Sequence, residues 1–162
     1  MKRLIVCFML VGLLAGTFAI SFFGSPGHSQ AASNSTIVGS WLFDVTLTSI
    51  NPPFSFHSLE TYDAGGTLVT TDQLSFNPQE LGSPGHGNWV SKGGDQFAST
   101  WITFTFDAKG NPAGHSKVQE TITVNADGRT LNGLGVFTAY DNHGKVVNSG
   151  TSKFAGQRIQ VI

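Results

Sequence analysis

The sequence predicts an all-β domain, a single eight-stranded antiparallel up-and-down β-barrel that follows an N-terminal signal peptide. Three observations lead to this fold class. After residue 37 no stretch carries helical periodicity of useful length. Instead, runs rich in Val, Ile, Thr, Phe, Tyr and Trp alternate with short segments rich in Gly, Asp and Asn, the pattern of strands joined by tight turns. Four of these turns repeat one design, which indicates consecutive hairpins.

The first 31 residues have the three parts of a secretory signal peptide. Lys2 and Arg3 form a basic start, residues 4–23 are uncharged and mostly apolar, and Ser29 and Ala31 place small residues at positions −3 and −1 of a cleavage site. We therefore expect cleavage after Ala31 and a secreted or periplasmic product. The alternative is an N-terminal membrane anchor, because a run of about twenty apolar residues is also long enough to span a bilayer.

Cleavage divides the chain into a signal peptide (1–31), a flexible lead-in (32–37) and a β-barrel domain (38–162). Of the 162 residues, 131 remain after the first 31 are removed, which suits one domain. The single cysteine, Cys7, leaves with the signal peptide. The exported domain therefore has no disulfide or thiol chemistry, and its stability must come from a hydrophobic core.

The charge of the exported domain is mildly negative. Two of the nine basic residues leave with the signal peptide, so seven face ten acidic residues and the net charge is about −3. The basic residues form no cluster. This excludes nucleic-acid binding through a basic surface and gives no attraction to a membrane once the signal is removed.

Eight segments after the lead-in have the composition and length of strands. Four of the connections between them share an order of residues: an apolar residue, Asp or Asn, two variable residues, and Gly. The Asp or Asn side chain can accept hydrogen bonds from the turn backbone, and Gly takes the positive φ that closes a tight hairpin. These turns start at Asp63, Asp107, Asn125 and Asp141. The strands are expected at residues 40–50, 54–63, 66–72, 87–92, 96–107, 115–125, 131–141 and 146–158.

Eight strands in a meander leave two open edges unless the sheet closes on itself. Closure removes the edges and gives a barrel whose interior holds side chains or one small ligand. The alternative is a β-sandwich with about the same number of strands. The one long connection, residues 73–86, contains Pro78 and Pro84 and is interpreted as a lid, a plug at one end or a simple loop.

The strand at residues 115–125 contains the most informative side chain. Val118 and Ile122 define an inward face, and Glu120 lies on the same face. A carboxylate there must be hydrogen-bonded, paired or neutral, because an isolated buried charge is very costly. One interpretation is a polar group in a ligand cavity, with a raised pKa. The other is a structural ion pair with Lys153 or Arg158.

Catalytic and metal-binding signatures are missing from the sequence. The four histidines of the exported domain show no paired spacing and have no cysteine beside them, so we expect no metal site and no cofactor. A Gly-x-Ser-x-Gly nucleophile elbow is also missing. Three candidates for a general acid or base are left: Glu120, His57 in the middle of a strand, and His86, whose flanking glycines let its backbone bend closely.

Both ends of the domain resemble the calycin superfamily, which includes the lipocalins and avidins. Gly39-Ser40-Trp41 opens the first strand as Gly-x-Trp opens that of lipocalins, and Arg158 stands where those proteins have a basic residue that packs on the Trp. The resemblance spans residues 38–160 and implies an eight-stranded barrel with an internal apolar pocket. The chain departs from lipocalins in having no disulfide, no visible C-terminal helix and no Thr-Asp-Tyr signature.

The leading functional hypothesis is a lipocalin-like protein that binds a small apolar or aromatic ligand inside the barrel. The resemblance to barrels of the allene oxide cyclase type implies a second hypothesis, a cyclase or isomerase that uses Glu120, His57 or His86 as general acid or base. A third is a structural or interaction barrel with a filled interior. The expected wall residues are Trp101, Phe104, Phe106, Val118, Ile122 and Phe137, with Glu120 as a polar contact.

Overall fold

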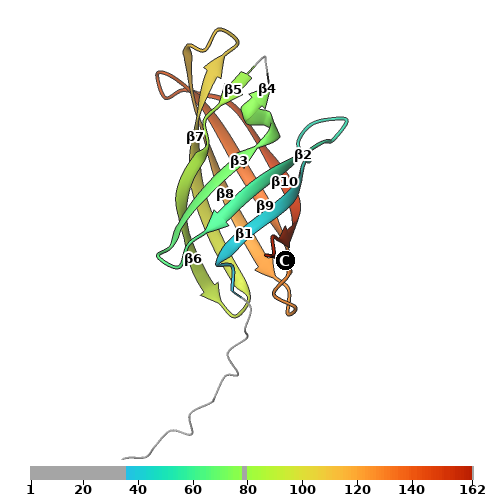
Figure 1. Ribbon diagram of the computed structural model, residues 1–162. Coiled ribbons are helices and arrows are strands. Elements are labelled where there is room, and N and C mark those ends of the chain that lie inside the picture. Colours follow the sequence, from blue (N-terminus) through green and yellow to red (C-terminus); the bar gives the residue numbers. More distant parts are fainter. Residues whose placement is uncertain (1–35, 78–79, 162) are drawn as a thin grey trace, which may run out of the picture.

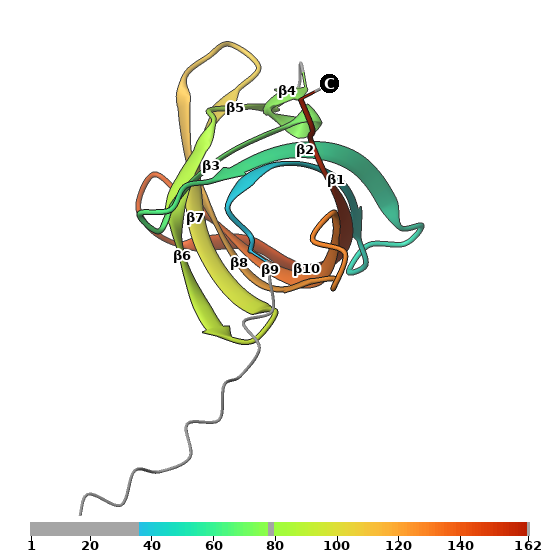
Figure 2. The same cartoon turned by 60° about the horizontal axis from the view of Figure 1, so that its bottom comes forward.

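The computed structural model describes residues 36–77 and 80–161, so the expected signal peptide and most of the expected lead-in lie outside the described residues. Ten strands form one sheet, and eight of them close into an antiparallel barrel (Figures 1 and 2). The predicted barrel is confirmed, and the sandwich alternative is wrong. Within the described ranges no helix is long and apolar enough to cross a membrane.

The eight barrel strands agree with the predicted ones to within a few residues at each end. Each pairs with the next barrel strand along the chain, and the last strand returns to pair with the first. The strands are β1 (Gly39–Leu47), β2 (Phe54–Tyr62), β3 (Thr67–Asp72), β6 (Gly85–Gly93), β7 (Gln96–Asp107), β8 (Pro112–Val124), β9 (Thr130–Asp141) and β10 (Val146–Arg158).

The four repeated turns have the predicted geometry. In each, the amide of the Gly donates to the carbonyl of the Asp or Asn three residues earlier. At Asp107 the carboxylate also accepts from the amides of Lys109 (2.8 Å) and Asn111 (2.9 Å), and the hydrogen bonds from Asn111 are the main cause that lowers the pKa of Asp107. The glycine that closes each of these turns has a positive φ: Gly66, Gly110, Gly128 and Gly144.

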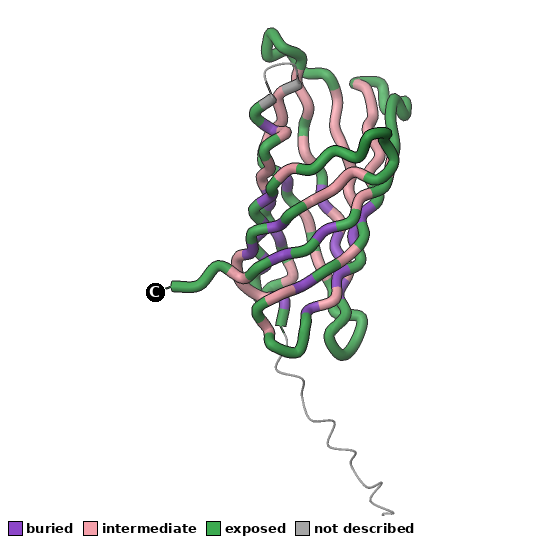
Figure 3. Tube along the Cα trace, turned by 90° about the vertical axis from the view of Figure 1, so that its right-hand side faces the viewer, coloured by how far each residue is buried: buried purple, intermediate pink, exposed green. Residues whose placement is uncertain are grey.

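A hydrophobic core fills the end of the barrel at which β1 begins. Figure 3 shows the buried residues gathered toward this end. Trp41 is fully buried, and its indole nitrogen donates to the carbonyl of Ile37 at 2.8 Å, so the last residue of the expected lead-in packs inside the core. Phe43 and Phe154 contact each other with ring centroids 5.3 Å apart. Loss of water from these large side chains is the main stabilising contribution to the fold.

Arg158 closes this end of the barrel from beneath. Its guanidinium lies over the Trp41 ring, 4.2 Å from the ring centroid. It also donates to the carbonyls of Gly128 (2.7 Å), Val38 (2.5 Å) and Thr36 (2.5 Å). One side chain therefore ties together both ends of the domain and the turn between β8 and β9.

The long connection between β3 and β6 lies at the opposite end of the barrel (Figure 1). It contains a short 3₁₀ helix, η1 (Gln73–Ser75), and a small hairpin of β4 (Phe76–Asn77) and β5 (Glu80–Gly82). β5 pairs with the end of β7 beyond the last pair that β6 makes. Asp72 fixes the start of η1 by accepting from the amide of Ser75 at 2.8 Å.

Replacing Arg158 by Ala should lower the free energy of unfolding by about 2 kcal/mol. The change removes a cation–π contact and leaves three carbonyls without their donor. The measurement is urea unfolding followed by tryptophan fluorescence. Arg129→Ala, in an exposed turn, is the matched control and should change stability by less than about 0.5 kcal/mol. Equal losses in the two variants would contradict the structural role assigned to Arg158.

Candidate functional site

The inner faces of the strands enclose a cavity of about 290 Å³ beyond the filled end. On β1 the same inward face runs from Trp41 and Phe43 in the core to Val45 and Leu47 in the cavity wall. The cavity extends to the end of the barrel covered by η1 and β5, which contribute Leu74 and Leu81. The long connection therefore forms part of the wall near the mouth. Further apolar wall residues are Phe56, Val118, Phe137 and Ala139.

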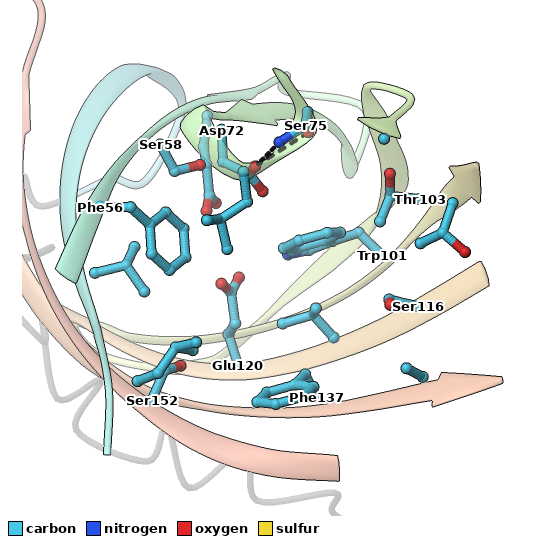
Figure 4. A pocket seen from close by; sticks show the side chains of 18 of the residues that line it. Phe56, Ser58, Asp72, Ser75, Trp101, Thr103, Ser116, Glu120, Phe137 and Ser152 are labelled. Atoms are coloured by element: carbon cyan, nitrogen blue, oxygen red, sulfur yellow. Dashed lines mark hydrogen bonds between the residues drawn. The ribbon is translucent and has the colours of Figure 1, made fainter. Parts of the chain in front are cut away.

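Two glutamates lie where the cavity meets the core. Glu60 on β2 and Glu120 on β8 both line the cavity, and they are 2% and 7% exposed. The hydroxyl of Tyr62 donates to Glu60, and the hydroxyl of Ser99 donates to Glu120 at 2.5 Å. Figure 4 shows the Glu120 carboxyl group extending into the cavity. The apolar cavity thus has a floor with two carboxyl groups.

Burial raises the pKa of both carboxyl groups, because a charged group loses its hydration in an apolar interior. The pKa of Glu120 rises to about 6, since the effect of burial exceeds the opposing effect of the hydrogen bond that Ser99 donates. Burial also raises the pKa of Glu60 well above its usual value, and the negative charge of Glu120 adds to this rise. Two acids in one buried site can therefore hold a proton at a pH at which exposed glutamates are ionised.

Trp101 lies flat against β6 because two glycines make room for it. A Cβ atom on Gly85 would lie 2.8 Å from the Trp101 ring, and one on Gly87 would lie 2.6 Å from the Trp101 Cβ. The indole nitrogen is buried and makes no hydrogen bond to any of the described residues. The indole and Glu120 face each other across the lower cavity in Figure 4. A buried donor without a partner is unusual and is available to a ligand or a water molecule.

The structure brings together four of the seven residues predicted to contact a ligand, Trp101, Val118, Glu120 and Phe137. Ile122 is on the inner face but fully buried in the core below the cavity. The predictions for Phe104 and Phe106 are wrong. Phe104 is 62% exposed on the outer face and Phe106 is not in the cavity wall, because alternation along β7 turns even-numbered residues away from the face that holds Trp101.

The histidines predicted as acid–base candidates do not lie in the cavity. His57 is on the outer face of the barrel, where its Nδ1 is 2.7 Å from a carboxylate oxygen of the equally exposed Asp44. His86 is also exposed, because the inward positions on either side of it are taken by Gly85 and Gly87. Only Glu120 of the three candidates lines the cavity.

The ion-pair interpretation of Glu120 is also wrong. Lys153 is exposed on the outer face of β10, and Arg158 is bound to Trp41 and backbone carbonyls at the far end. Glu60 is one of three carboxylates, with Asp44 and Glu120, that the sequence places well inside strands, but the sequence does not show that Glu60 and Glu120 share one cavity. The sequence did contain a sign of the inward position of Glu60, because Phe56, Ser58, Glu60 and Tyr62 alternate along one face of β2. Two of these four residues are Ser and Glu, so the face does not look apolar and its inward orientation is hard to recognise.

The chemistry available in the cavity is that of carboxyl groups and hydroxyls. In the part of the chain that the structure describes, no group of three or more His, Cys, Asp or Glu side chains is placed to hold a metal ion. A protonated carboxyl donates a hydrogen bond and an ionised one accepts, so the pair can hold a polar ligand group or transfer a proton. Comparisons with models of known families, with curated proteins and with solved structures find no match.

The pKa of Glu120 predicts how stability depends on pH. Glu120 releases its proton near pH 4.5 in the unfolded chain and at about 6 in the folded one. Between these values the folded state binds more protons, so the free energy of unfolding falls as the pH rises. The loss due to Glu120 is about 2 kcal/mol by pH 7.5, and Glu60 acts in the same direction.

Urea unfolding at a series of pH values from 4.5 to 7.5 measures this loss. Glu120→Gln should make the decline clearly shallower, because it removes the titrating group and its charge beside Glu60. Asp95→Asn removes a carboxylate from an exposed turn and should leave the decline unchanged. If the free energy of unfolding falls with pH equally steeply in the wild type and in the Glu120→Gln variant, Glu120 does not cause the pH dependence.

Proposed function

We propose that the protein is an exported binding protein that holds one small, largely apolar ligand in the barrel cavity. The observation that carries this proposal is the division of the interior. Large side chains fill one end, whereas a space of about 290 Å³ with mostly apolar walls is left at the other. Small-molecule sites start at about 300 Å³, and an apolar cavity of about 150 Å³ holds benzene. The cavity therefore suits a ligand with one or two rings.

The polar groups of the cavity support a specific orientation of this ligand. Trp101 offers a buried N–H donor without a partner among the described residues, and Glu120 and Glu60 offer carboxyl groups in the same cavity. An apolar wall with a few polar groups at one place is the usual construction of a small-molecule site. A purely structural barrel would gain stability from a filled interior at this end too.

The lipocalin-like part of the proposal is supported by the closed end. Gly39-Ser40-Trp41 begins β1, and Arg158 lies over the Trp41 ring as the resemblance to calycins implies. The export part is supported by the sequence of residues 1–31 alone. The ligand would thus be met outside the cytoplasm.

A catalytic role is the second candidate. It is favoured by the coupled carboxyl groups, because Glu120 has a pKa of about 6 and could exchange a proton with a bound substrate near neutral pH. The reaction class would be an isomerisation or cyclisation that needs one proton donor and one acceptor. Incubating the ligand that co-purifies with the protein would test it: conversion by the wild type and not by Glu120→Gln supports catalysis, and an unchanged ligand contradicts it.

The binding proposal predicts that filling the cavity abolishes binding. Ala139 lines the cavity, whereas Ala155 is exposed on the outer face of β10. We expect Ala139→Phe to weaken the binding of indole at least about tenfold, because the added ring takes up the space the ligand needs. Ala155→Phe, the matched control, should bind indole as the wild type does. The measurement is titration calorimetry at pH 7.5.

Two results would contradict the binding proposal. One is an affinity for indole that Ala139→Phe does not change, which would place the binding elsewhere. The other is the failure of every small aromatic probe to bind the wild type, combined with native mass spectrometry that finds no ligand on the protein purified from its export compartment.

A further inference from the structure

The floor of the cavity holds carboxyl groups that no Lys or Arg side chain of the described residues pairs with. Glu60, Glu120 and Asp72 all line the cavity. The contacts of the two glutamates are hydroxyl donors, Tyr62 and Ser99, and Asp72 accepts from η1. Buried carboxylates in proteins are normally paired with a cation, because hydroxyl donors replace only part of the lost hydration.

In the described part of the chain, no strand around the floor brings a Lys or Arg side chain into the cavity. β1, β3, β7 and β9 carry no Lys or Arg. The lysines on the other barrel strands point away from the cavity. They are Lys92 on β6, Lys117 on β8 and Lys153 on β10. Arg158 is held at the opposite end of the barrel. The remaining ones, Lys109, Arg129 and Lys145, lie in exposed turns.

We propose that the ligand supplies the missing positive charge. It is an organic amine, whose ammonium group lies between Glu60 and Glu120 and whose apolar part fills the rest of the cavity. This inference rests on the proposed binding function and specifies its ligand class. An ammonium group has up to three N–H donors for the two carboxylates, and the apolar remainder contacts Val118 and Phe137. The same floor disfavours ligands that end in a carboxylate, because like charges in a buried site repel.

The ionisation of the floor agrees with this ligand class. Binding an ammonium favours the ionised carboxyl groups, so the affinity for an amine should fall as the pH drops below about 6, where Glu120 takes up its proton. A neutral analogue gains nothing from ionised carboxylates and should not lose affinity in this range.

Three probes with one indole ring and different ends test the inference. Tryptamine has an ammonium, tryptophol a hydroxyl and indole-3-acetate a carboxylate on a side chain of similar length. At pH 7.5 we expect calorimetry to show tryptamine binding at least about tenfold more tightly than tryptophol, and indole-3-acetate more weakly than both.

Variants locate the source of this preference. Glu60→Gln and Glu120→Gln keep the shape of the floor, and each should reduce the preference for tryptamine over tryptophol at least about fivefold while tryptophol still binds. Asp44→Asn, which removes a carboxylate from the outer face, is the matched control and should leave the preference intact. Urea unfolding confirms that each variant is folded.

The outcomes separate the two proposals. If tryptophol binds at least as tightly as tryptamine, the amine inference is wrong and the binding function stands. If tryptamine is preferred equally by the wild type and by the double variant of Glu60 and Glu120, the preference comes from elsewhere and the inference is also wrong. If neither indole nor any of the three probes binds, the amine inference is wrong, and the binding function is wrong as well when native mass spectrometry also finds no ligand on the exported protein.

Discussion

A closed barrel allows each strand only one inner face, and this constraint determines where every functional side chain of the protein lies. Side chains alternate along a strand, so the position of one anchor places all the others on that strand. Trp41 is such an anchor on β1, because it is held by Ile37 and Arg158. Once Trp41 is inside, Val45 and Leu47 must be inside as well, and they become cavity wall.

The size of the inward side chains changes along the barrel axis. Trp41, Phe43 and Phe154 occupy the closed end, and close packing there leaves little free space. Farther along, the inward positions carry smaller groups such as Val45, Ser152 and Ala139. These smaller side chains leave part of the space that forms the cavity. The cavity is therefore mainly a consequence of which residues occupy the inward positions, and the long connection between β3 and β6 adds wall near the mouth.

Local chemistry made most of the fold predictable. The turns at Asp63, Asp107, Asn125 and Asp141 depend on hydrogen bonds within a few residues, and the strand boundaries follow from them. The inner face of β7 was harder, because both of its faces carry large apolar side chains. Phe104 stays on the outside with most of its surface exposed, so hydrophobicity alone points to the wrong face.

The site itself depended on contacts between distant strands, which a single sequence does not display. Glu120 stood out because apolar residues flank it on its own face of β8. Glu60 did not, because its neighbours Ser58 and Tyr62 are polar, and the two acids meet only when the barrel closes. The glycines beside His86 were interpreted as freedom for the histidine. These positions need glycine because Trp101 of the neighbouring strand β7 packs against them, and a side chain at either position would collide with it.

Under the proposed binding function, the two glutamates are the place where stability and ligand selection compete in this barrel. Apolar side chains of the same size at positions 60 and 120 would continue the core, and such replacements of buried charge often stabilise a protein. The chain instead keeps two acids whose burial opposes their ionisation. Their cost falls on the empty protein at neutral pH, and a ligand that neutralises them would remove it. Burying two unpaired carboxyl groups destabilises the ligand-free protein. This helps to select a ligand, because a molecule without a positive charge leaves the two groups unpaired.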